Sequence, residues 1–186
     1  MKKTMLIVVA LILLLGLLSG EEIDYRNLEW DALVELGMNG DAEAQNELAG
    51  RYYLAEGVPQ DYEEALKWCR LAADQGHAIA QENIGLMYHM GQGVDQDYME
   101  ALKWYRLAAD QGFATSQLNI GVLYSQGNGV TQDFQEARKW LLKAADQGNA
   151  DAQYNLGHFY VSGWGCTPNL QEALSWFLLA ADQGHA

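Results

Sequence analysis

The side chains that most often act as nucleophiles are few in this chain, and none has the local context of an activated nucleophile. Beyond residue 20 the serines are Ser116, Ser125, Ser162 and Ser175. None lies in G-x-S-x-G or S-x-x-K, where a strained turn or a neighbouring lysine activates the hydroxyl. We therefore predict no catalytic residue and expect that the chain is not an enzyme.

The histidines are the next candidates, because imidazole serves as a general base and is the commonest metal ligand. They are His77, His89, His158 and His185. No two are three or four residues apart, so no helix face carries a ligand pair like that of H-E-x-x-H. We interpret them as turn or surface residues, with metal ligands as the alternative, and predict no metal site.

Glycine-rich segments such as GQGV at 91–94 resemble the start of a phosphate-binding loop. Such a loop follows a strand and opens a helix, whereas this segment follows a helical pattern. Glycine readily adopts the left-handed backbone angles that end a helix. The sequence therefore predicts turns here, and no cofactor.

The elements that must position these side chains recur every 36 residues. Such a period is typical of arrays in which each repeat is one supersecondary unit. We expect repeats at 42–77, 78–113, 114–149 and 150–186. The residues in phase are the AADQG segments, Trp68, Trp104, Trp140 and Trp176, Tyr52, Tyr88, Tyr124 and Tyr160, and Ala65, Ala101, Ala137 and Ala173.

Each repeat contains two helical patterns separated by a turn. In the second repeat, residues 78–90 have apolar and small residues at steps of three and four, as on one helix face. A second helix begins at Asp97, with Glu100 placed to complete a capping box, and ends at Gly112. Glu63 and Lys67 have the spacing of a helix-surface pair. The other predicted capping boxes are Asp61/Glu64, Asp133/Glu136 and Asn169/Glu172.

Two features of the composition limit the partners and the covalent structure. All 25 acidic side chains but only nine of the eleven basic ones follow residue 20, a formal charge of −16. Nucleic-acid binding depends on Lys and Arg, so we predict no nucleic-acid partner. Cys69 and Cys166 lie in the first and last repeats. A disulfide needs its Cα atoms within about 7 Å, so we predict none.

The first 41 residues differ from the repeats. Lys2 and Lys3 precede an apolar run at 5–18 that is shorter than the roughly 20 residues of a membrane span. We interpret 1–20 as a secretory signal peptide, with an uncleaved signal anchor as the alternative. Residues 21–41 resemble a degenerate second helix and predict an amino-terminal capping helix.

The repeat pattern resembles the Sel-one-like repeat (SLR) family, relatives of tetratricopeptide repeats. The shared residues are A-x-A-Q-x-x-L-G-x-x-Y, G-x-G-V-x-x-D and A-x-x-W-x-x-x-A-A-x-x-G, across 42–186. The chain departs from them at Ala49 and Ala55, where the pattern has Gly, and at Cys166 and Asn169. The resemblance implies an all-α fold, a right-handed α-solenoid of four 36-residue helix–turn–helix repeats, which binds proteins or peptides.

A helical wheel identifies the first-helix residues that point away from the packed stripe. In a tetratricopeptide-like solenoid this face lines a concave groove. Asn83, Asn119 and Asn155 would form a ladder able to pair with a peptide backbone, or would instead bond to the neighbouring helix. The candidate binding residues are Glu43, Glu47, Asn83, Leu86, Met90, Asn119, Val122, Asn155 and His158.

Two further features bear on partners. The recurring Trp and Tyr residues are interpreted as core contacts, but Trp164 stands alone in a polar turn, as a partner contact or folded onto its own hairpin. The last second helix keeps the apolar interior pattern, and arrays usually end in a polar-faced unit. We expect self-association through the C-terminal repeat, or a partner there; an inward-turned Trp176 or a truncated gene product is the alternative.

The sequence as a whole predicts a non-catalytic interaction module or scaffold of the bacterial envelope, periplasmic or secreted. Its partner would be a protein or peptide, with basic residues opposite Glu43 and Glu47. One alternative is a secreted SLR enzyme or binder of β-lactam or peptidoglycan-like ligands, but those relatives usually carry many paired cysteines. The other is a scaffold anchored in the inner membrane and facing the periplasm, if the amino-terminal segment is not cleaved.

Overall fold

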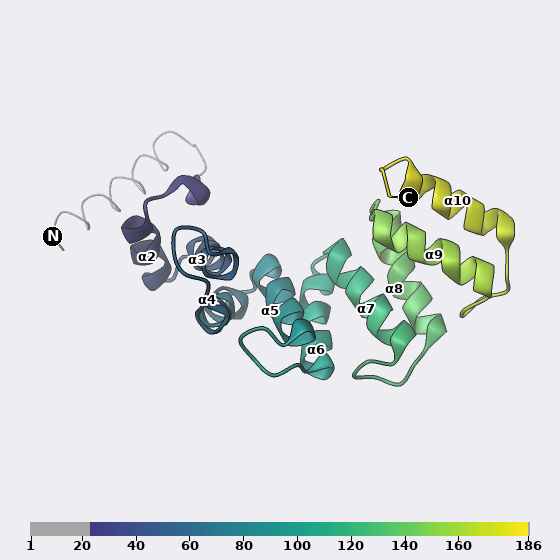
Figure 1. The fold of residues 1–186 in the computed structure, drawn as a ribbon, viewed down its shortest axis with the longest axis horizontal. Helices are drawn as coiled ribbons and strands as arrows, with labels where there is room; N and C mark the ends of the chain where they lie inside the picture. Colours follow the sequence, from purple (N-terminus) through teal and green to yellow (C-terminus); the bar gives the residue numbers. More distant parts are fainter. Residues whose placement is uncertain (1–22, 186) are drawn as a thin grey trace. The chain divides into compact units, whose positions relative to one another are not determined.

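We describe residues 23–185 from a computed structural model (Figure 1). The signal segment predicted at 1–20 lies outside these residues. The described part of the chain contains the 3-10 helix η1 (Tyr25–Asn27), nine α-helices and no strand. This confirms the predicted all-α class with four helix–turn–helix repeats. The helices are α2 (Trp30–Met38), α3 (Ala42–Leu54), α4 (Tyr62–Asp74), α5 (Ala78–Met90), α6 (Tyr98–Asp110), α7 (Ala114–Gln126), α8 (Phe134–Asp146), α9 (Ala150–Ser162) and α10 (Leu170–Ala181).

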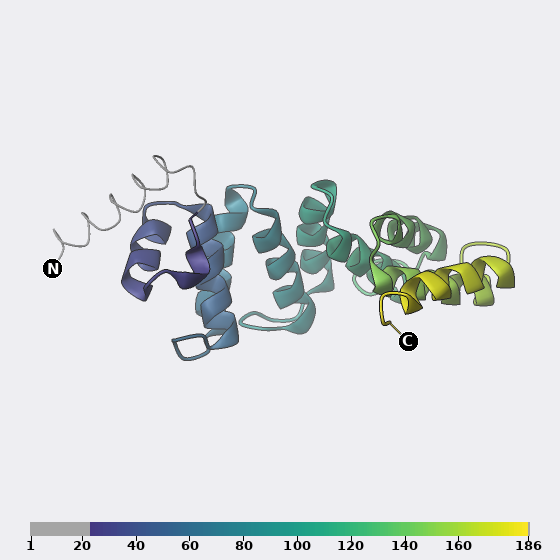
Figure 2. The same cartoon turned by 90° about the horizontal axis from the view of Figure 1, so that it is seen from above.

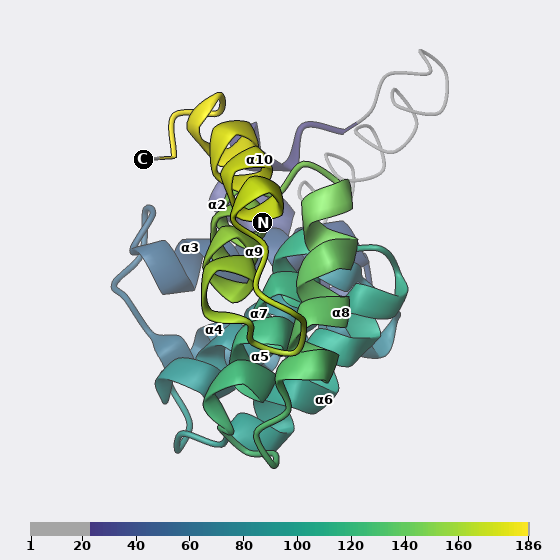
Figure 3. The same ribbon diagram turned by 90° about the vertical axis from the view of Figure 1, so that its right-hand side faces the viewer.

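The helices pack against their neighbours in the chain, within two compact units. One comprises residues 23–84 with 92–94, and the other comprises 85–91 with 95–185. In the first, α2 packs on α3 and α3 packs on α4. In the second, each of α6 to α10 contacts the next, and the two helices of a pair lie side by side (Figures 2 and 3). None of the described helices is long and apolar enough to cross a membrane.

The predicted capping boxes form only in part. The side chains of Asp61, Asp97, Asp133 and Asn169 do accept a hydrogen bond from the backbone amide three residues on. Their own N–H groups, however, donate to tyrosine carbonyls of the preceding helix, as Asp61 does to Tyr52. The loop brings each cap back to a helix end whose carbonyls lack partners. The N–H of each cap residue therefore does not bond to the glutamate side chain, and the prediction of that second hydrogen bond of the capping box is wrong.

Three of these four glutamates pair with lysines instead, whereas Glu172 has Ser175 at the equivalent position. Glu64 accepts from Lys67 at 2.7 Å, and Glu136 accepts from Lys139 at 3.0 Å. Lys67 thus pairs with the residue three before it, and the structure contradicts the predicted Glu63–Lys67 pair. Both spacings bring side chains together on a helix surface, and the i,i+3 geometry is the one adopted here.

The recurring glutamines join consecutive helices. Gln117 in α7 donates from Nε2 to the Ala109 carbonyl at the end of α6, at 3.3 Å. Gln147, from the AADQG segment after α8, donates to Oε1 of Gln117 at 2.8 Å. This arrangement pairs a buried amide with a helix-end carbonyl, as buried polar groups require. It recurs at Gln45 with Gln75 and at Gln153 with Gln183.

Close helix contact in each hairpin depends on one small residue in the first helix. A Cβ atom on Gly85 would lie 2.6 Å from the ring of Tyr105 in α6. Gly121 meets Leu141 and Gly157 meets Phe177 in the same way. In the first repeat the equivalent residues are Ala49 and Cys69, both buried. The first repeat thus has a larger residue on α3, Ala49 instead of glycine, and a smaller one on α4, Cys69. Burial raises the pKa of the Cys69 thiol to about 12.

Candidate binding surface

Glu43 and Glu47, the carboxylates expected to face basic residues of a partner, already have contacts within the first unit. Glu47 lies 3.1 Å from the guanidinium of Arg51, which also donates to backbone carbonyls of η1 and the residues around it. Glu43 contacts the imidazole of His77 at 3.1 Å. Glu47 therefore holds the amino-terminal segment through Arg51, which weakens its expected preference for a basic partner.

A shallow hollow of about 340 Å³ adjoins this pair. Its lining carries charges of both signs, from Arg26, Glu47 and Glu56, together with Gly50 and Leu54. The Arg26 cation and the Arg51 pair offset the local acidity. The hollow therefore offers a mixed rather than a purely acidic surface.

The predicted asparagine ladder has a different environment at each step. Asn83 donates to Asn46 of α3 across a long 3.5 Å contact, as the alternative of bonding to a neighbouring helix implies. Asn155 donates to the Asp151 carbonyl of its own helix at 2.8 Å. Within residues 23–185, the half-buried Asn119 has no hydrogen-bond partner. The three amides are therefore not equivalent, and each would have to be tested separately.

The apolar residues of the predicted surface also differ in exposure. Leu86 is 37% exposed and Met90 is 58% exposed on α5. Val122 is half-buried and packs against the core cluster formed by α7, α8 and α9. Val122 therefore contributes to the core as well as to the surface, whereas Leu86 and Met90 are available to a partner.

A second hollow, of about 380 Å³, lies on α7, α9 and their adjoining loops, and we call it the Trp164 hollow. Its aromatic floor comprises Phe134, Phe159 and Trp164, and its polar rim comprises Ser125, Gln126, Gln132, Asn155 and His158. Two predicted binding residues, Asn155 and His158, thus lie together here with Trp164.

Trp164 contacts both its own hairpin and the preceding repeat. Its ring stacks on Phe134 of α8, with centroids 5.3 Å apart and planes 17° apart. It also meets the edge of Phe159 in α9 at 5.5 Å. It nevertheless remains 43% exposed. Trp164 therefore does fold onto its own hairpin, which was one of its two expected roles, and the exposed part of its ring still faces solvent.

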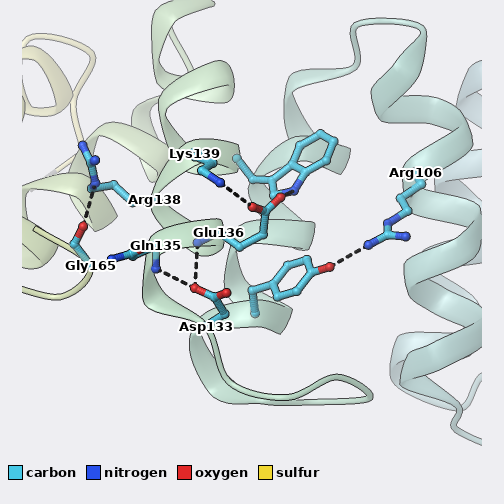
Figure 4. A network of polar contacts seen from close by, with 9 residues as sticks. Arg106, Asp133, Gln135, Glu136, Arg138, Lys139 and Gly165 are labelled. Atoms are coloured by element: carbon cyan, nitrogen blue, oxygen red, sulfur yellow. Dashed lines mark hydrogen bonds and ion pairs between the residues drawn. The ribbon is translucent and has the colours of Figure 1, made fainter.

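The loop holds Trp164 in place through its backbone. The Trp164 N–H donates to the Phe159 carbonyl at 3.0 Å. Gly165 follows with φ +64°, and a Cβ there would collide with the backbone of Phe134. Arg138 donates from Nε to the Gly165 carbonyl at 3.2 Å (Figure 4). The second glycine of the G-x-G turn is thus a packing contact with the preceding repeat.

Most of the rim's polar groups are held by internal hydrogen bonds that leave one atom of each amide open. Gln132 donates to the Ser125 carbonyl at 2.7 Å, and Gln126 accepts from Asn128 at 2.8 Å. Within the described chain, Oδ1 of Asn155, Oε1 of Gln132 and Nε2 of Gln126 have no partner. The rim therefore presents two acceptors and one donor in fixed positions, and no carboxylate is part of the lining.

Sequence reasoning missed Phe134, although a signal for it was present. Phe134 occupies the position of Tyr62 and Tyr98, and Trp164 occupies the position of Gln92 and Asn128. Both are departures from the repeat, and the structure stacks them. Their contact spans 30 residues, so only the folded chain shows that the two departures belong together.

The C-terminal repeat exposes less apolar surface than the sequence predicted. Trp176 and Phe177 are half-buried: Trp176 packs against the core cluster, and Phe177 lies against Gly157, Tyr154 and His158. Trp176 is thus turned inward, which is the alternative given for the expected apolar surface of this helix, and Phe177 is not fully exposed either. The large apolar residues of α10 that remain exposed are Leu170, Leu174, Leu178 and Leu179.

Metal or thiol chemistry has no assembled site in the part of the chain that the structure describes. No group of three His, Cys, Asp or Glu side chains gathers there with the spacing of metal ligands. Cys69 is buried in α4, and the half-buried Cys166 contacts the Phe159 carbonyl through Sγ at 3.7 Å.

The repeats match one family throughout their length. The family model described as "Sel1 repeat" matches residues 42–77, 78–113, 114–149 and 150–185. The chain is a Sel1 repeat protein. This confirms the resemblance inferred from the recurring residues. A comparison with curated proteins found no match.

Solved structures of Sel1 repeat proteins resemble this one. The protective antigen c5321 from uropathogenic Escherichia coli, which displays an SLR fold, is 40% identical with a TM-score of 0.83. A Sel1 repeat protein from Oxalobacter formigenes is 34% identical, with a TM-score of 0.75 over 82% of this chain. Cysteine-rich protein B of Helicobacter pylori is 22% identical, with a TM-score of 0.53 over 68% of this chain and 96% of its own, and shares the fold.

The first two of these proteins are longer than the Sel1 repeat protein described here. The match covers 85% of this chain but 34% of c5321, and it covers 64% of the Oxalobacter protein. Sel1 repeats are generally interaction modules on non-catalytic helical scaffolds.

Proposed function

We propose that this Sel1 repeat protein is a non-catalytic module that binds a protein or peptide through the exposed faces of its first helices. The observation that carries the proposal is the Trp164 hollow. There an exposed tryptophan, two other aromatic rings and three amide side chains, each with one atom that has no partner within the described residues, line one space. Aromatic anchors surrounded by fixed polar groups are typical of binding hot spots.

Crosslinking of the full chain in the cells that produce it, followed by mass spectrometry, tests this proposal. A specific partner should be captured by the wild-type chain and lost from the double variant Asn155→Ala, His158→Ala. Leu107→Ala is a matched control, because Leu107 is an exposed residue of α6 outside both hollows. Equal capture by all three chains would overturn the proposal.

The cellular location is part of the same proposal. We place the module in the bacterial envelope, periplasmic or secreted, because a basic start and a short apolar run precede the repeats. Fractionation with amino-terminal sequencing tests this: a mature chain that begins near residue 21 supports export. A full-length chain in the membrane fraction would support the anchored scaffold, and a full-length soluble chain would contradict both.

A second contact surface is proposed on α10. Leu170 and Leu174 occupy the positions of Phe134 and Arg138 in α8, which the loop after α9 covers through Gly165. A further hairpin of the same kind, from a second copy or a partner, therefore fits this face. Sedimentation equilibrium should show association of the wild type that Leu174→Glu with Leu178→Glu abolishes; a wild type that stays monomeric at micromolar concentration would refute the self-association.

A further inference from the structure

The Trp164 hollow has the features of a pocket for one particular kind of side chain, and this inference rests on the proposed function. We propose that it takes an uncharged aromatic side chain with a polar tip, tyrosine or tryptophan, from the partner's peptide chain. The hollow's volume of about 380 Å³ is at the small end for ligand pockets. It therefore suits one large side chain rather than an extended ligand.

The charges around the hollow disfavour a cationic occupant. Its lining contains no carboxylate, and the guanidinium of Arg138 is bound to the loop that carries Trp164. Two nearby carboxylates are engaged elsewhere: Asp133 caps α8, and Asp151 lies 3.3 Å from His185. A desolvated lysine or arginine needs an opposite charge, and none faces it here. An anionic occupant would likewise meet no lysine or arginine in the lining.

The aromatic floor favours a ring over an aliphatic chain. Trp164 and Phe134 are already nearly parallel, and 43% of the Trp164 surface is still exposed. Aromatic rings attract each other in stacked and edge-on arrangements beyond the effect of area alone. The open Oδ1 of Asn155 can accept the hydroxyl or indole proton of the entering side chain, and Nε2 of Gln126 can donate to a hydroxyl. Tyrosine and tryptophan have both an aromatic ring and a polar group that can bond to the rim amides, whereas phenylalanine has only the ring.

Single-residue probes test the pocket without knowledge of the partner. The full chain, labelled with ¹⁵N, is titrated with the N-acetyl amides of tyrosine, tryptophan, phenylalanine, leucine and lysine. The Trp164 indole N–H signal, assigned with Trp164→Phe, should shift most with the tyrosine and tryptophan probes and least with lysine. Trp164→Ala should weaken binding of the tyrosine probe about two- to tenfold, and Leu107→Ala should not change it.

A charge introduced on the rim provides an independent check that leaves the aromatic floor intact. Gln126→Glu adds a carboxylate, so the lysine probe should gain affinity relative to the tyrosine probe. Preference of the unmodified hollow for the lysine or leucine probe would overturn the proposal, as would the absence of any shift at Trp164. If the partner is still lost with Asn155→Ala, His158→Ala while no aromatic probe binds, only this inference fails; if the partner is retained, the proposed function fails too.

Discussion

The contact between Gly85 and Tyr105 gives the sharpest test of how the hairpins are packed. A Cβ at position 85 would lie 2.6 and 2.7 Å from two ring carbons of Tyr105, whose side chain is fully buried. Overpacking of this kind costs about 1–3 kcal/mol, and alanine in place of glycine returns about 1 kcal/mol in a helix. Truncation of the ring by Tyr105→Cys should cost about 3–5 kcal/mol.

The double variant Gly85→Ala, Tyr105→Cys recreates the Ala49–Cys69 pair of the first repeat. With the ring removed, the new Cβ has no clash, so the double variant should be at least as stable as Tyr105→Cys alone. The two changes should therefore deviate from additivity by about 1–3 kcal/mol, in the stabilising direction. The lost contacts of the Tyr105 hydroxyl cancel, because both cysteine variants lack it.

Urea unfolding of the four chains, followed by circular dichroism, measures this coupling. Gly50→Ala in α3 is the matched control, because a Cβ there meets no atom within 4 Å. It should stabilise the chain by up to about 1 kcal/mol and should show no coupling to Tyr105→Cys. Additive effects of Gly85→Ala and Tyr105→Cys, within about 0.5 kcal/mol, would refute the matched-size explanation of the first repeat.

Three further predictions concern single residues. Ala55 ends α3 with φ 61° and ψ 36°, a conformation that strains residues other than glycine. Ala55→Gly should therefore raise the free energy of unfolding in urea by about 0.5–1 kcal/mol. A lower stability of this variant would contradict the prediction. Burial, and then the hydrogen bond to Asp41, raise the pKa of Tyr25 to about 12. An unfolded tyrosine ionises near pH 10, so the contribution of the Tyr25 hydroxyl to the free energy of unfolding is complete below pH 10 and should be lost between pH 10 and 12. When the stability of Tyr25→Phe is measured by denaturation over the same range, it should not show this loss between pH 10 and 12. The buried Cys69 thiol, with its raised pKa, should resist iodoacetamide in the native chain at pH 8 and react in urea, whereas Cys166 should react in both; mass spectrometry would disprove this if Cys69 were modified first.

Much of the fold could be predicted because it depends on patterns of residues close together in the sequence. Helix α5 has the bounds 78–90 that the apolar spacing indicated, and each second helix begins after its expected cap. Helix periodicity and capping depend on residues within about one turn of each other. The 36-residue period then implied four equivalent hairpins.

The partners of polar side chains were less predictable. The sequence predicted that Glu64 completes the cap at Asp61 and that Glu63 pairs with Lys67. The course of the loop instead satisfies the Asp61 N–H at Tyr52, and Glu64 pairs with Lys67. In the same way, the AADQG glutamines were evident as a recurring pattern. Their bonds to first-helix glutamines, as from Gln147 to Gln117, depend on how consecutive helices pack.

The candidate site divides along the same line. The sequence by itself determined that Asn155 and His158 lie on one free face of a helix, because residues three apart share a helix face wherever that helix is placed. Only the tertiary structure decided that Trp164 stacks on Phe134 and closes a hollow beside them. Residues 30 positions apart meet only when two hairpins are packed at a particular distance. Here Gly165 lies against the backbone of Phe134, and no local pattern contains this contact between consecutive hairpins.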